Sequence, residues 1–437
     1  GSWGERMSGF RYEPCGTIDH GIARRQFMGE FLTGGALMAG TSLFSHPLGA
    51  GELVSRGRSM GVVYLNGGIS QFESWDPKRD VETGGPFREI STTVPGVQIS
   101  ELLPRPAQQM HHMALIRSIS TELDDHGLAN NLVRSGRMTR SATEYPELGA
   151  VVARGLERVD FPLPGHITTL VGGAGGRANN AAYLGPAYAS VGVGAEQGGI
   201  VNAQLPDGLT VAVDGRRHDW RRFVNSRHRS RVQSAEMDAY AQSYEQALRL
   251  MEKRDLFDIS RESMAVQEAY GRSEFGRQLL LARRLVEQEV PFIEVQHAGW
   301  DFHHNNFEFH LHYVADFDGP FACFLGDLAE RGLLERTLVI VMTEFGRTPS
   351  INAGYGRDHY PKAWSMAAAG CGIQHGAVIG ATDAKGVEVT ERKVDHRHLF
   401  HTWLRAVGID SGGQFEIGGR KFPIADPAFG PIEELLV

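Results

Sequence analysis

The chain has few cysteines and no excess of positive charge. Only Cys15, Cys323 and Cys371 occur among its 437 residues, and none of them belongs to a C-x-x-C pair. This spacing supports neither a thiolate zinc site nor a disulfide framework. The formal net charge is −8, whereas a nucleic-acid-binding protein needs a basic surface to displace counterions. We therefore expect no nucleic acid among the partners.

Long hydrophobic runs are also missing. An apolar segment near the N-terminus, residues 31–44, is too short and too interrupted by glycine to span a membrane. It follows Arg24-Arg25-Gln26-Phe27-Met28, and together the two segments resemble a twin-arginine export signal. The alternative is a chance arginine pair before a core helix. We predict that residues 1–50 are a signal and leader, and that the protein is periplasmic or extracellular.

The rest of the composition is typical of a globular protein. Hydrophobic residues make up 41% of the chain and charged residues 22%, and the 54 glycines separate short apolar runs. Glycines placed in this way predict tight turns and close backbone approaches. We find no fixed-period repeat and no low-complexity linker after the leader. Residues 51–437 are therefore predicted to form a single domain with insertions.

Short apolar runs alternate with helical patterns along the chain. Strands are predicted at 61–65, 113–118, 291–295, 337–342, 365–369 and 377–379, and helices at 102–113, 128–135, 233–288 and 395–407. A run such as Thr337-Leu338-Val339-Ile340-Val341-Met342 is typical of a central parallel strand covered on both faces. The order predicts an α/β fold with a mostly parallel central sheet flanked by helices.

Two other stretches receive less specific interpretations. Residues 171–176 contain a Gly-Gly-x-Gly-Gly pattern, but no Lys-Ser or Lys-Thr follows, so a surface loop is favoured over a phosphate cradle. The arginine-rich residues 216–231 are interpreted as a solvated face or a connection.

Three clusters of polar residues directly follow predicted strands. They are Gly299-Trp300-Asp301-Phe302-His303, Thr343-Glu344-Phe345-Gly346-Arg347 and Gly356-Arg357-Asp358-His359. Because the carboxyl ends of parallel strands open into one crevice, we expect these clusters to meet there.

The clusters contain the ligand types that a hydrolytic divalent metal site needs: carboxylates for charge and neutral imidazoles for nitrogen ligands. The predicted metal-binding residues are Asp301, His303, Glu344, Asp358 and His359, with His297 and His304 as further candidates. Each residue also has an ordinary structural explanation, because an aspartate can cap a turn, histidines can lie on the surface, and Glu344 can pair with Arg347.

Arginine and histidine supply the other predicted functions of the site. Arg347 and Arg357 stand beside the clusters, and the planar guanidinium group matches a tetrahedral oxyanion such as phosphate or sulfate. His126 follows a predicted strand and begins a helix, where the helix dipole favours an anion. His126 and Arg347 are therefore candidate catalytic residues, although a histidine beside two aspartates is more often a neighbour of an N-cap.

The order of these motifs resembles a family of exported bacterial proteins known as domain of unknown function 1501. The resemblance rests on Gly67-Gly68-Ile69-Ser70-Gln71 after the first strand, the Gly299 cluster, Glu344-Phe345-Gly346-Arg347-Thr348-Pro349 and Gly356-Arg357-Asp358-His359-Tyr360-Pro361. It covers nearly the whole chain and implies a relation to sulfatases and alkaline phosphatases, whose α/β core binds one or two divalent ions.

The resemblance also implies departures from that superfamily. Asn66, kept as a candidate catalytic residue, stands where an acidic metal ligand is usual, and Phe345 stands where a histidine is usual. No Ser, Thr or Cys nucleophile occupies the helix start, which holds His126-Gly127 instead. Direct attack by water at the metal would fit this missing hydroxyl.

Two functions follow as expectations. The first is an exported metal-dependent hydrolase of phosphate or sulfate esters, which acts on an anionic small molecule or glycan with zinc, calcium or manganese. The second is a non-catalytic descendant of the fold that binds an anionic glycan or a cell-envelope partner.

Overall fold

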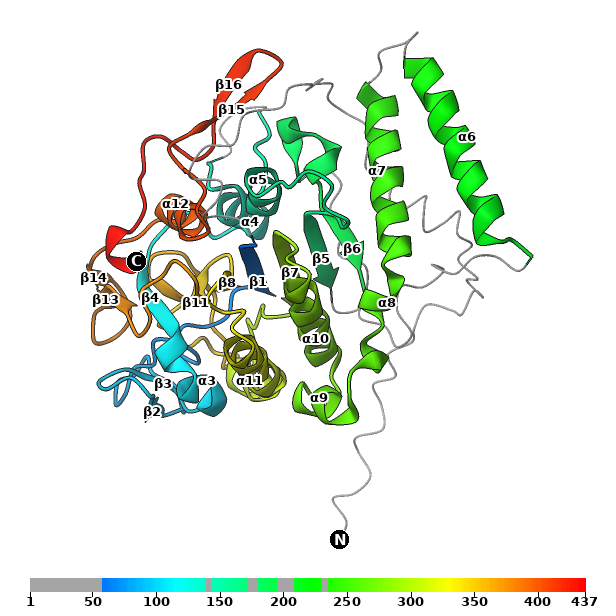
Figure 1. Ribbon diagram of the computed structural model, residues 1–437. Coiled ribbons are helices and arrows are strands. Elements are labelled where there is room, and N and C mark those ends of the chain that lie inside the picture. The colour runs from blue at the N-terminus through cyan, green and yellow to red at the C-terminus, as the bar shows by residue number, and fades with distance from the viewer. Residues whose placement is uncertain (1–56, 139–142, 171–179, 195–207, 230–234) are drawn as a thin grey trace.

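A computed structural model describes residues 57–138, 143–170, 180–194, 208–229 and 235–437 (Figure 1). The predicted signal and leader and the glycine-rich residues 171–176 lie outside these ranges. Among the described residues, no helix combines the length and the apolar character needed to cross a bilayer.

The centre of the molecule is a sheet of eight strands in the order β12-β4-β11-β8-β1-β7-β5-β6. The strands are β1 (Ser59–Asn66), β4 (Met113–Ile119), β5 (His166–Leu170), β6 (Val191–Val193), β7 (Phe292–Ala298), β8 (Thr337–Met342), β11 (Trp364–Gly370) and β12 (Val378–Ile379). Only β11 runs antiparallel to its neighbours β4 and β8, and the other pairs are parallel. The predicted mostly parallel sheet is confirmed.

Helices cover both faces of this sheet (Figure 1). The α-helices of the described residues are α3 (Pro104–Gln108), α4 (His126–Ser135), α5 (Leu148–Gly155), α6 (Val211–Arg229), α7 (Ala235–Glu252), α8 (Arg254–Phe257), α9 (Met264–Ala269), α10 (Glu274–Glu287), α11 (Asn306–Glu330) and α12 (His396–Ala406). Strand β1 faces both layers, because successive side chains of a strand point to opposite faces. Val63 and Leu65 pack with α10 and α11, whereas Val62 and Tyr64 pack with α4, α5 and α12.

Four two-stranded ribbons complete the described structure. They pair β2 (Glu89–Ser91) with β3 (Gln98–Ser100), β9 (Gly346–Arg347) with β10 (His359–Tyr360), β13 (Ala381–Thr382) with β14 (Val389–Glu391), and β15 (Gln414–Ile417) with β16 (Arg420–Pro423). The β9–β10 ribbon matters most for the site, because its register sets His359 opposite Arg347.

Several helices differ from the predicted ones. The helix predicted at 102–113 is the short α3 followed by a turn of 3₁₀ helix, Met110–His112. The helical stretch predicted at 233–288 is divided into α7 to α10, and Asp258, Ser263 and Ser273 accept backbone N–H groups where new turns begin. Such capping side chains end one helix and start the next. The described part of the arginine-rich stretch, residues 216–229, belongs to helix α6.

Candidate metal centre

The polar clusters gather at the carboxyl edge of the sheet. Strands β7 and β8 flank β1 in parallel register, so the segments that follow them leave the same edge. Strand β4 runs in the same direction and leads to α4, which begins at His126. The ribbon partner β10 brings His359 back toward this edge. The prediction that the clusters meet is therefore confirmed for their main members.

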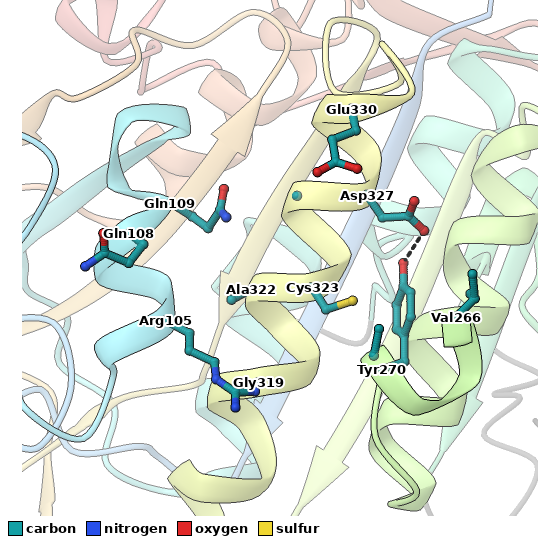
Figure 2. A pocket seen from close by; sticks show the side chains of 12 residues that line it. Arg105, Gln108, Gln109, Val266, Tyr270, Gly319, Ala322, Cys323, Asp327 and Glu330 are labelled. Carbon is teal, nitrogen blue, oxygen red and sulfur yellow. Dashed lines mark hydrogen bonds between the residues drawn. The ribbon is translucent and has the colours of Figure 1, made fainter. Parts of the chain in front are cut away.

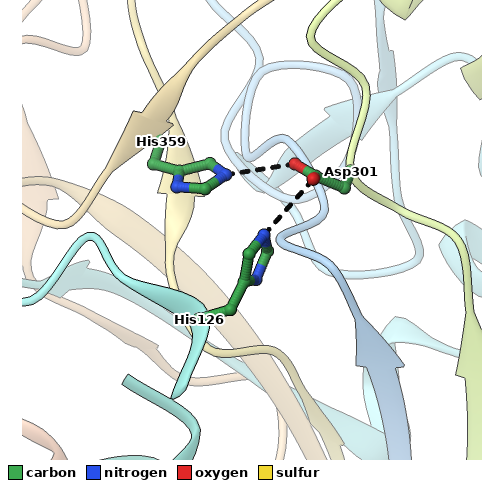
Figure 3. A group of neighbouring side chains, drawn as sticks. All are labelled: His126, Asp301 and His359. Atoms are coloured by element: carbon green, nitrogen blue, oxygen red, sulfur yellow. Dashed lines mark hydrogen bonds and ion pairs between the residues drawn. The ribbon is translucent and has the colours of Figure 1, made fainter. Parts of the chain in front are cut away.

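Asp301 lies at the middle of the group (Figure 3). Its Oδ1 atom lies 3.0 Å from His303 Nε2 and 3.1 Å from His359 Nε2. Its Oδ2 atom lies 3.3 Å from His126 Nε2. The two nitrogens His303 Nε2 and His359 Nε2 are 3.0 Å apart. Three imidazoles from three different segments thus turn the same ring nitrogen toward one carboxylate.

The partners of the other ring nitrogens fix the tautomers of His359 and His303. His359 Nδ1 lies 2.6 Å from the carbonyl oxygen of Asp124, and a carbonyl can only accept, so Nδ1 carries the proton. His303 Nδ1 lies 2.7 Å from Asp358 Oδ1, and this hydrogen bond lowers the pKa of the Asp358 carboxyl. In the neutral form of both rings, Nε2 therefore presents a lone pair.

His126 follows the same pattern. Its Nδ1 atom lies 2.8 Å from Oε1 of the buried Glu344, so a neutral ring again presents its Nε2 lone pair to Asp301. Imidazoles that bind a metal usually donate their second N–H to a carboxylate or a carbonyl in this way. The hydrogen bond to Glu344 raises the pKa of His126, although partial burial acts in the opposite direction.

This donor set fits a divalent cation. Without a proton or a cation among them, the lone pairs of His303, His359 and Asp301 would repel one another at 3.0 to 3.1 Å. Ligand atoms about 2.0–2.1 Å from one ion lie roughly 3.0–3.4 Å apart, which is close to these distances. Imidazole nitrogens suit zinc, whereas calcium takes an all-oxygen set, so calcium is the least suited of the three predicted metals. Among the described residues, His126, Asp301 and His359 have ligand atoms close enough to one another to hold an ion. His303 Nε2 lies 3.0 Å from both Asp301 Oδ1 and His359 Nε2 and so belongs with the same donor atoms.

Glu344 and Asp358 were predicted as metal ligands, but their carboxylates lie behind the imidazoles that they hold. Glu344 Oε1 also accepts from the backbone N–H of Gly67 at 2.8 Å. Its other oxygen, Oε2, lies 3.2 Å from Thr343 Oγ1 and 3.3 Å from the Tyr64 hydroxyl. Burial and the nearby charge of Glu344 raise the pKa of Tyr64 well above its usual value. Both oxygens of Glu344 are thus occupied within the protein.

Arg347 is buried beneath Asp301 and donates to it at 2.6 Å. Its other donors go to backbone carbonyls of the surrounding loops, namely those of Gly67, Gly68, Trp300 and Arg357. Burial acts to raise the pKa of Asp301, but the hydrogen bond and charge of Arg347 outweigh it and hold that pKa well below its usual range. This geometry suits a residue that positions Asp301 better than one that binds a substrate anion.

Two further candidates, Arg357 and His297, have their polar groups bound to other parts of the protein. Arg357 is fully buried and pairs with Glu73 at 3.0 Å, and it donates to three backbone carbonyls besides. His297 lies within the core, where its Nδ1 accepts from Trp300 Nε1 at 2.9 Å and its Nε2 lies 3.2 Å from Asp316. Both residues support the loops of the site from below and do not join the cluster around Asp301.

Asn66 and His304 border the cluster. Asn66 ends β1 opposite Ala298, and its carbonyl accepts from the backbone N–H of Trp300 at 3.1 Å. This bond fixes the turn that carries Asp301. The exposed His304 lies beside Gly354, where a Cβ atom would come within 2.3 Å of its Nδ1.

Two groups that shape the site were not among the predicted site residues. One is the Asp124 carbonyl, which is a backbone atom and therefore independent of residue type. The other is the wall formed by Phe345, whose ring centroid lies 4.9 Å from that of His126 and 4.3 Å from that of His359. The glycine pair after β1 was a usable signal, because a Cβ at Gly67 would lie 2.7 Å from the backbone nitrogen of Asp301.

A cavity of about 520 Å³ lies away from this cluster, along α11 between α3 and α9 (Figure 2). Arg105, Tyr270, Cys323 and Asp327 are among its lining residues, and the Tyr270 hydroxyl donates to Asp327 at 3.0 Å. Burial raises the pKa of the Cys323 thiol to about 11, which leaves it protonated and unreactive near neutral pH. The cavity therefore offers no catalytic group to the metal cluster.

A family model described as "Protein of unknown function (DUF1501)" matches residues 58–436. Among curated proteins, a comparison with the sequence finds no match.

Several solved structures are similar to the chain. The lipoteichoic acid synthase LtaP from Listeria monocytogenes is 7% identical, with a TM-score of 0.38 over 85% of this chain and 76% of that one. The PsFucS1 sulfatase from Pseudoalteromonas sp. is 14% identical, with a TM-score of 0.35 over 83% and 72%. The alkaline phosphatase from the Antarctic bacterium TAB5 is 12% identical, with a TM-score of 0.35 over 80% and 98%. These likenesses concern the fold and say nothing of activity.

Proposed function

The chain belongs to the DUF1501 family, and we propose that it is a metal-dependent hydrolase of phosphate or sulfate esters that acts outside the cytoplasm. One observation carries the proposal. The Nε2 atoms of His126, His303 and His359 converge on Asp301 while each Nδ1 is held by an acceptor. The resemblance of the sequence motifs to those of sulfatases and alkaline phosphatases supports the two ester classes.

Asp301, His303 and His359 would hold the ion, because their converging atoms are the closest set. Asp358 and the Asp124 carbonyl would keep the two imidazoles in the ligating tautomer. When bound, a divalent ion would polarise the oxygens of the ester and lower the pKa of water. The imidazole-rich set favours zinc or manganese over calcium.

His126 would transfer protons. Glu344 holds its Nδ1–H, so Nε2 can accept a proton from an attacking water and return it to the leaving oxygen. The side chain is 37% exposed, which leaves this nitrogen accessible to a substrate. At the start of α4 the residue is followed by Gly127 and Leu128, and none of these can act as a hydroxyl or thiol nucleophile.

Metal analysis and ester hydrolysis test the proposal together. Purified protein loaded with zinc or manganese should hold about one ion per chain and should hydrolyse an aryl phosphate or an aryl sulfate. Asp301→Ala should lose both the ion and the activity, by at least about a hundredfold in rate. The matched control is Asp255→Ala, which removes an exposed aspartate with a surface partner only. Loaded protein that hydrolyses neither ester, together with unchanged metal content in Asp301→Ala, would refute the proposal.

A second candidate is a non-catalytic descendant of the fold that binds an anionic glycan or an envelope partner. The burial of Arg347 and Arg357 favours it, because their donors are directed at protein oxygens and not at an open site. Metal analysis of the native protein separates the two functions. A stoichiometric ion favours the enzyme, and the absence of any ion favours the binding protein.

The proposed location outside the cytoplasm rests on the arginine pair Arg24-Arg25, the apolar segment that follows it and the resemblance to a family of exported proteins. Replacing both arginines by lysine should keep the protein in the cytoplasm, because the twin-arginine receptor reads the pair and not its charge alone. Cell fractionation measures this outcome. Export of the doubly substituted chain at the normal level would contradict it.

A further inference from the structure

Helix α6 carries an exposed apolar and basic surface on one side. We call this surface the outer face of α6, and it consists of Arg216, Arg217, Trp220, Phe223, Val224 and Arg227, all of them exposed. Trp220 is 67% exposed, and Phe223 and Val224 are each more than half exposed. At 100° per residue these positions fall within an arc of about 120°. The surface is therefore a continuous stripe along the helix.

The opposite side of α6 is anchored to α7. Arg222 pairs with Glu245 at 3.1 Å, and Arg221 pairs with the same carboxylate. Arg221 also lies over the ring of Tyr244, whose edge meets His218. These contacts turn the outer face away from the rest of the molecule, and α6 lies at the margin of the structure beyond α7 (Figure 1).

The composition of the outer face is unusual for this chain. The whole protein has a formal net charge of −8, but the six positions include three arginines and no acidic residue. The nearest acid on the helix, Asp219, is paired with Arg222. Isolated exposed apolar residues are common, whereas a tryptophan, a phenylalanine and a valine flanked by cations on one stripe call for an explanation.

We propose that the outer face of α6 docks on an anionic lipid bilayer, with the apolar side chains at the headgroup boundary and the arginines on lipid phosphates. Tryptophan is enriched at the headgroup level of a bilayer, and arginine side chains on the same stripe can reach lipid phosphates while their apolar stems stay in contact with the membrane. The 19 residues of α6 give it a length of roughly 28 Å along the surface. Anionic lipids complement the local positive charge.

The ring geometry favours a bilayer over a glycan or a nucleic acid. Trp220 and Phe223 meet edge to face at 89°, so they offer no pair of coplanar faces on which sugars or bases could stack. The Arg227 guanidinium lies over the Phe223 ring, 5.7 Å from its centroid, and occupies one of those faces. Pairing of two outer faces would bring six arginines together, which disfavours a second copy of the chain as the partner.

Vesicle binding tests this proposal with the full chain. We expect binding to vesicles of phosphatidylcholine with phosphatidylglycerol, little binding to phosphatidylcholine alone, and loss of binding at high salt. Trp220→Ser with Phe223→Ser should weaken binding at least about tenfold. Arg216→Gln with Arg217→Gln should weaken it about fivefold per arginine. A blue shift of tryptophan emission on binding should disappear in Trp220→Phe.

Matched controls lie outside α6. Met264→Ser removes an exposed apolar side chain from α9, and Arg272→Gln removes an exposed cation, so both variants should bind vesicles normally. The N-terminal segment is the same in every variant, and differences between variants therefore report on α6. Absent vesicle binding, equal binding by the α6 variants, or binding to dextran sulfate or DNA in place of vesicles would each overturn the proposal.

Discussion

Replacing Glu344 by glutamine would remove one negative charge from behind His126 while keeping the shape of the side chain. The amide oxygen can take the place of Oε1 and accept from His126 Nδ1 and Gly67 N, both of which lie 2.8 Å from that atom. The amide nitrogen then faces Thr343 Oγ1, whose own proton goes to the Leu65 carbonyl, so this oxygen can accept. The variant therefore keeps the hydrogen bonds of this side chain and loses its negative charge.

The size of the expected effect follows from the difference in strength between a hydrogen bond to a charged group and one to a neutral group. A hydrogen bond to a charged group contributes about 1.5–3 kcal/mol and a neutral one about 0.5–1.5 kcal/mol. The difference, roughly 1–1.5 kcal/mol, corresponds to about a tenfold change in an equilibrium constant. In the proposed reaction His126 transfers protons, and the Glu344 charge stabilises the imidazolium that forms when its Nε2 takes up a proton. We therefore expect the rate of ester hydrolysis by the zinc-loaded protein to fall about tenfold in Glu344→Gln, while the zinc affinity is kept.

The rate of aryl-ester hydrolysis at saturating zinc measures this loss. Competition with a chromogenic zinc chelator measures the zinc affinity, and near-ultraviolet circular dichroism establishes that the variant is folded. Glu416→Gln is the matched control, because Glu416 is exposed on β15, outside the cluster. An unchanged rate of hydrolysis in folded, zinc-loaded Glu344→Gln would refute the reasoning, as would an equal loss in the control.

Three further predictions concern the site and the core. Asp358→Ala removes the acceptor of His303 Nδ1 and should weaken zinc binding about tenfold, whereas Asp358→Asn keeps an acceptor and should lose less in the same chelator assay. Removal of the ion with EDTA should lower the thermal unfolding temperature of the wild type, and zinc should restore it, because an ion bound only by the folded state stabilises that state. Neither treatment should change the unfolding temperature of Asp301→Ala. An unchanged temperature in the wild type would argue against a bound ion. Burial lowers the pKa of His396 from 6.5 to about 4, so its stabilising contribution is complete above pH 6.5 and is lost as the pH falls toward 4. Urea unfolding should therefore show that the wild type loses about 3 kcal/mol more than His396→Phe over this range, and equal losses would contradict the assignment.

Local patterns predicted much of the fold. The run at Thr337–Met342 is β8, because a strand buried on both faces needs apolar residues at every position. The end of α4 follows from Gly136, which adopts the left-handed conformation with φ of 61°. The reversed direction of β11 was not predictable from such patterns, since a buried strand has the same composition in either direction.

The site was predictable in its membership more than in its geometry. Strand ends indicated Asp301, His303 and His359, because topology alone brings these positions together. The division between residues in the cluster and those behind it depends on contacts between distant segments, such as Asp124 with His359, 235 positions apart. The outer face of α6 was likewise not predictable, because the sequence of an arginine-rich stretch does not show which of its side chains contact a neighbouring helix.

The antiparallel direction of β11 determines which part of the chain should become more ordered when an ion binds. When two successive strands are parallel, the connection between them starts at the carboxyl edge of the sheet and ends at the opposite edge. Because β11 runs antiparallel to β8, the connection between these two strands both starts and ends at the carboxyl edge. Residues 343–363 therefore carry Glu344, Arg347, Asp358 and His359 on a single loop. In hydrogen exchange, the amides of this loop should gain protection together when an ion binds, as one cooperative unit. Binding or loss of the ion would thus change the order of one contiguous stretch of chain, whereas Asp301, His303 and His126 reach the ion from other segments.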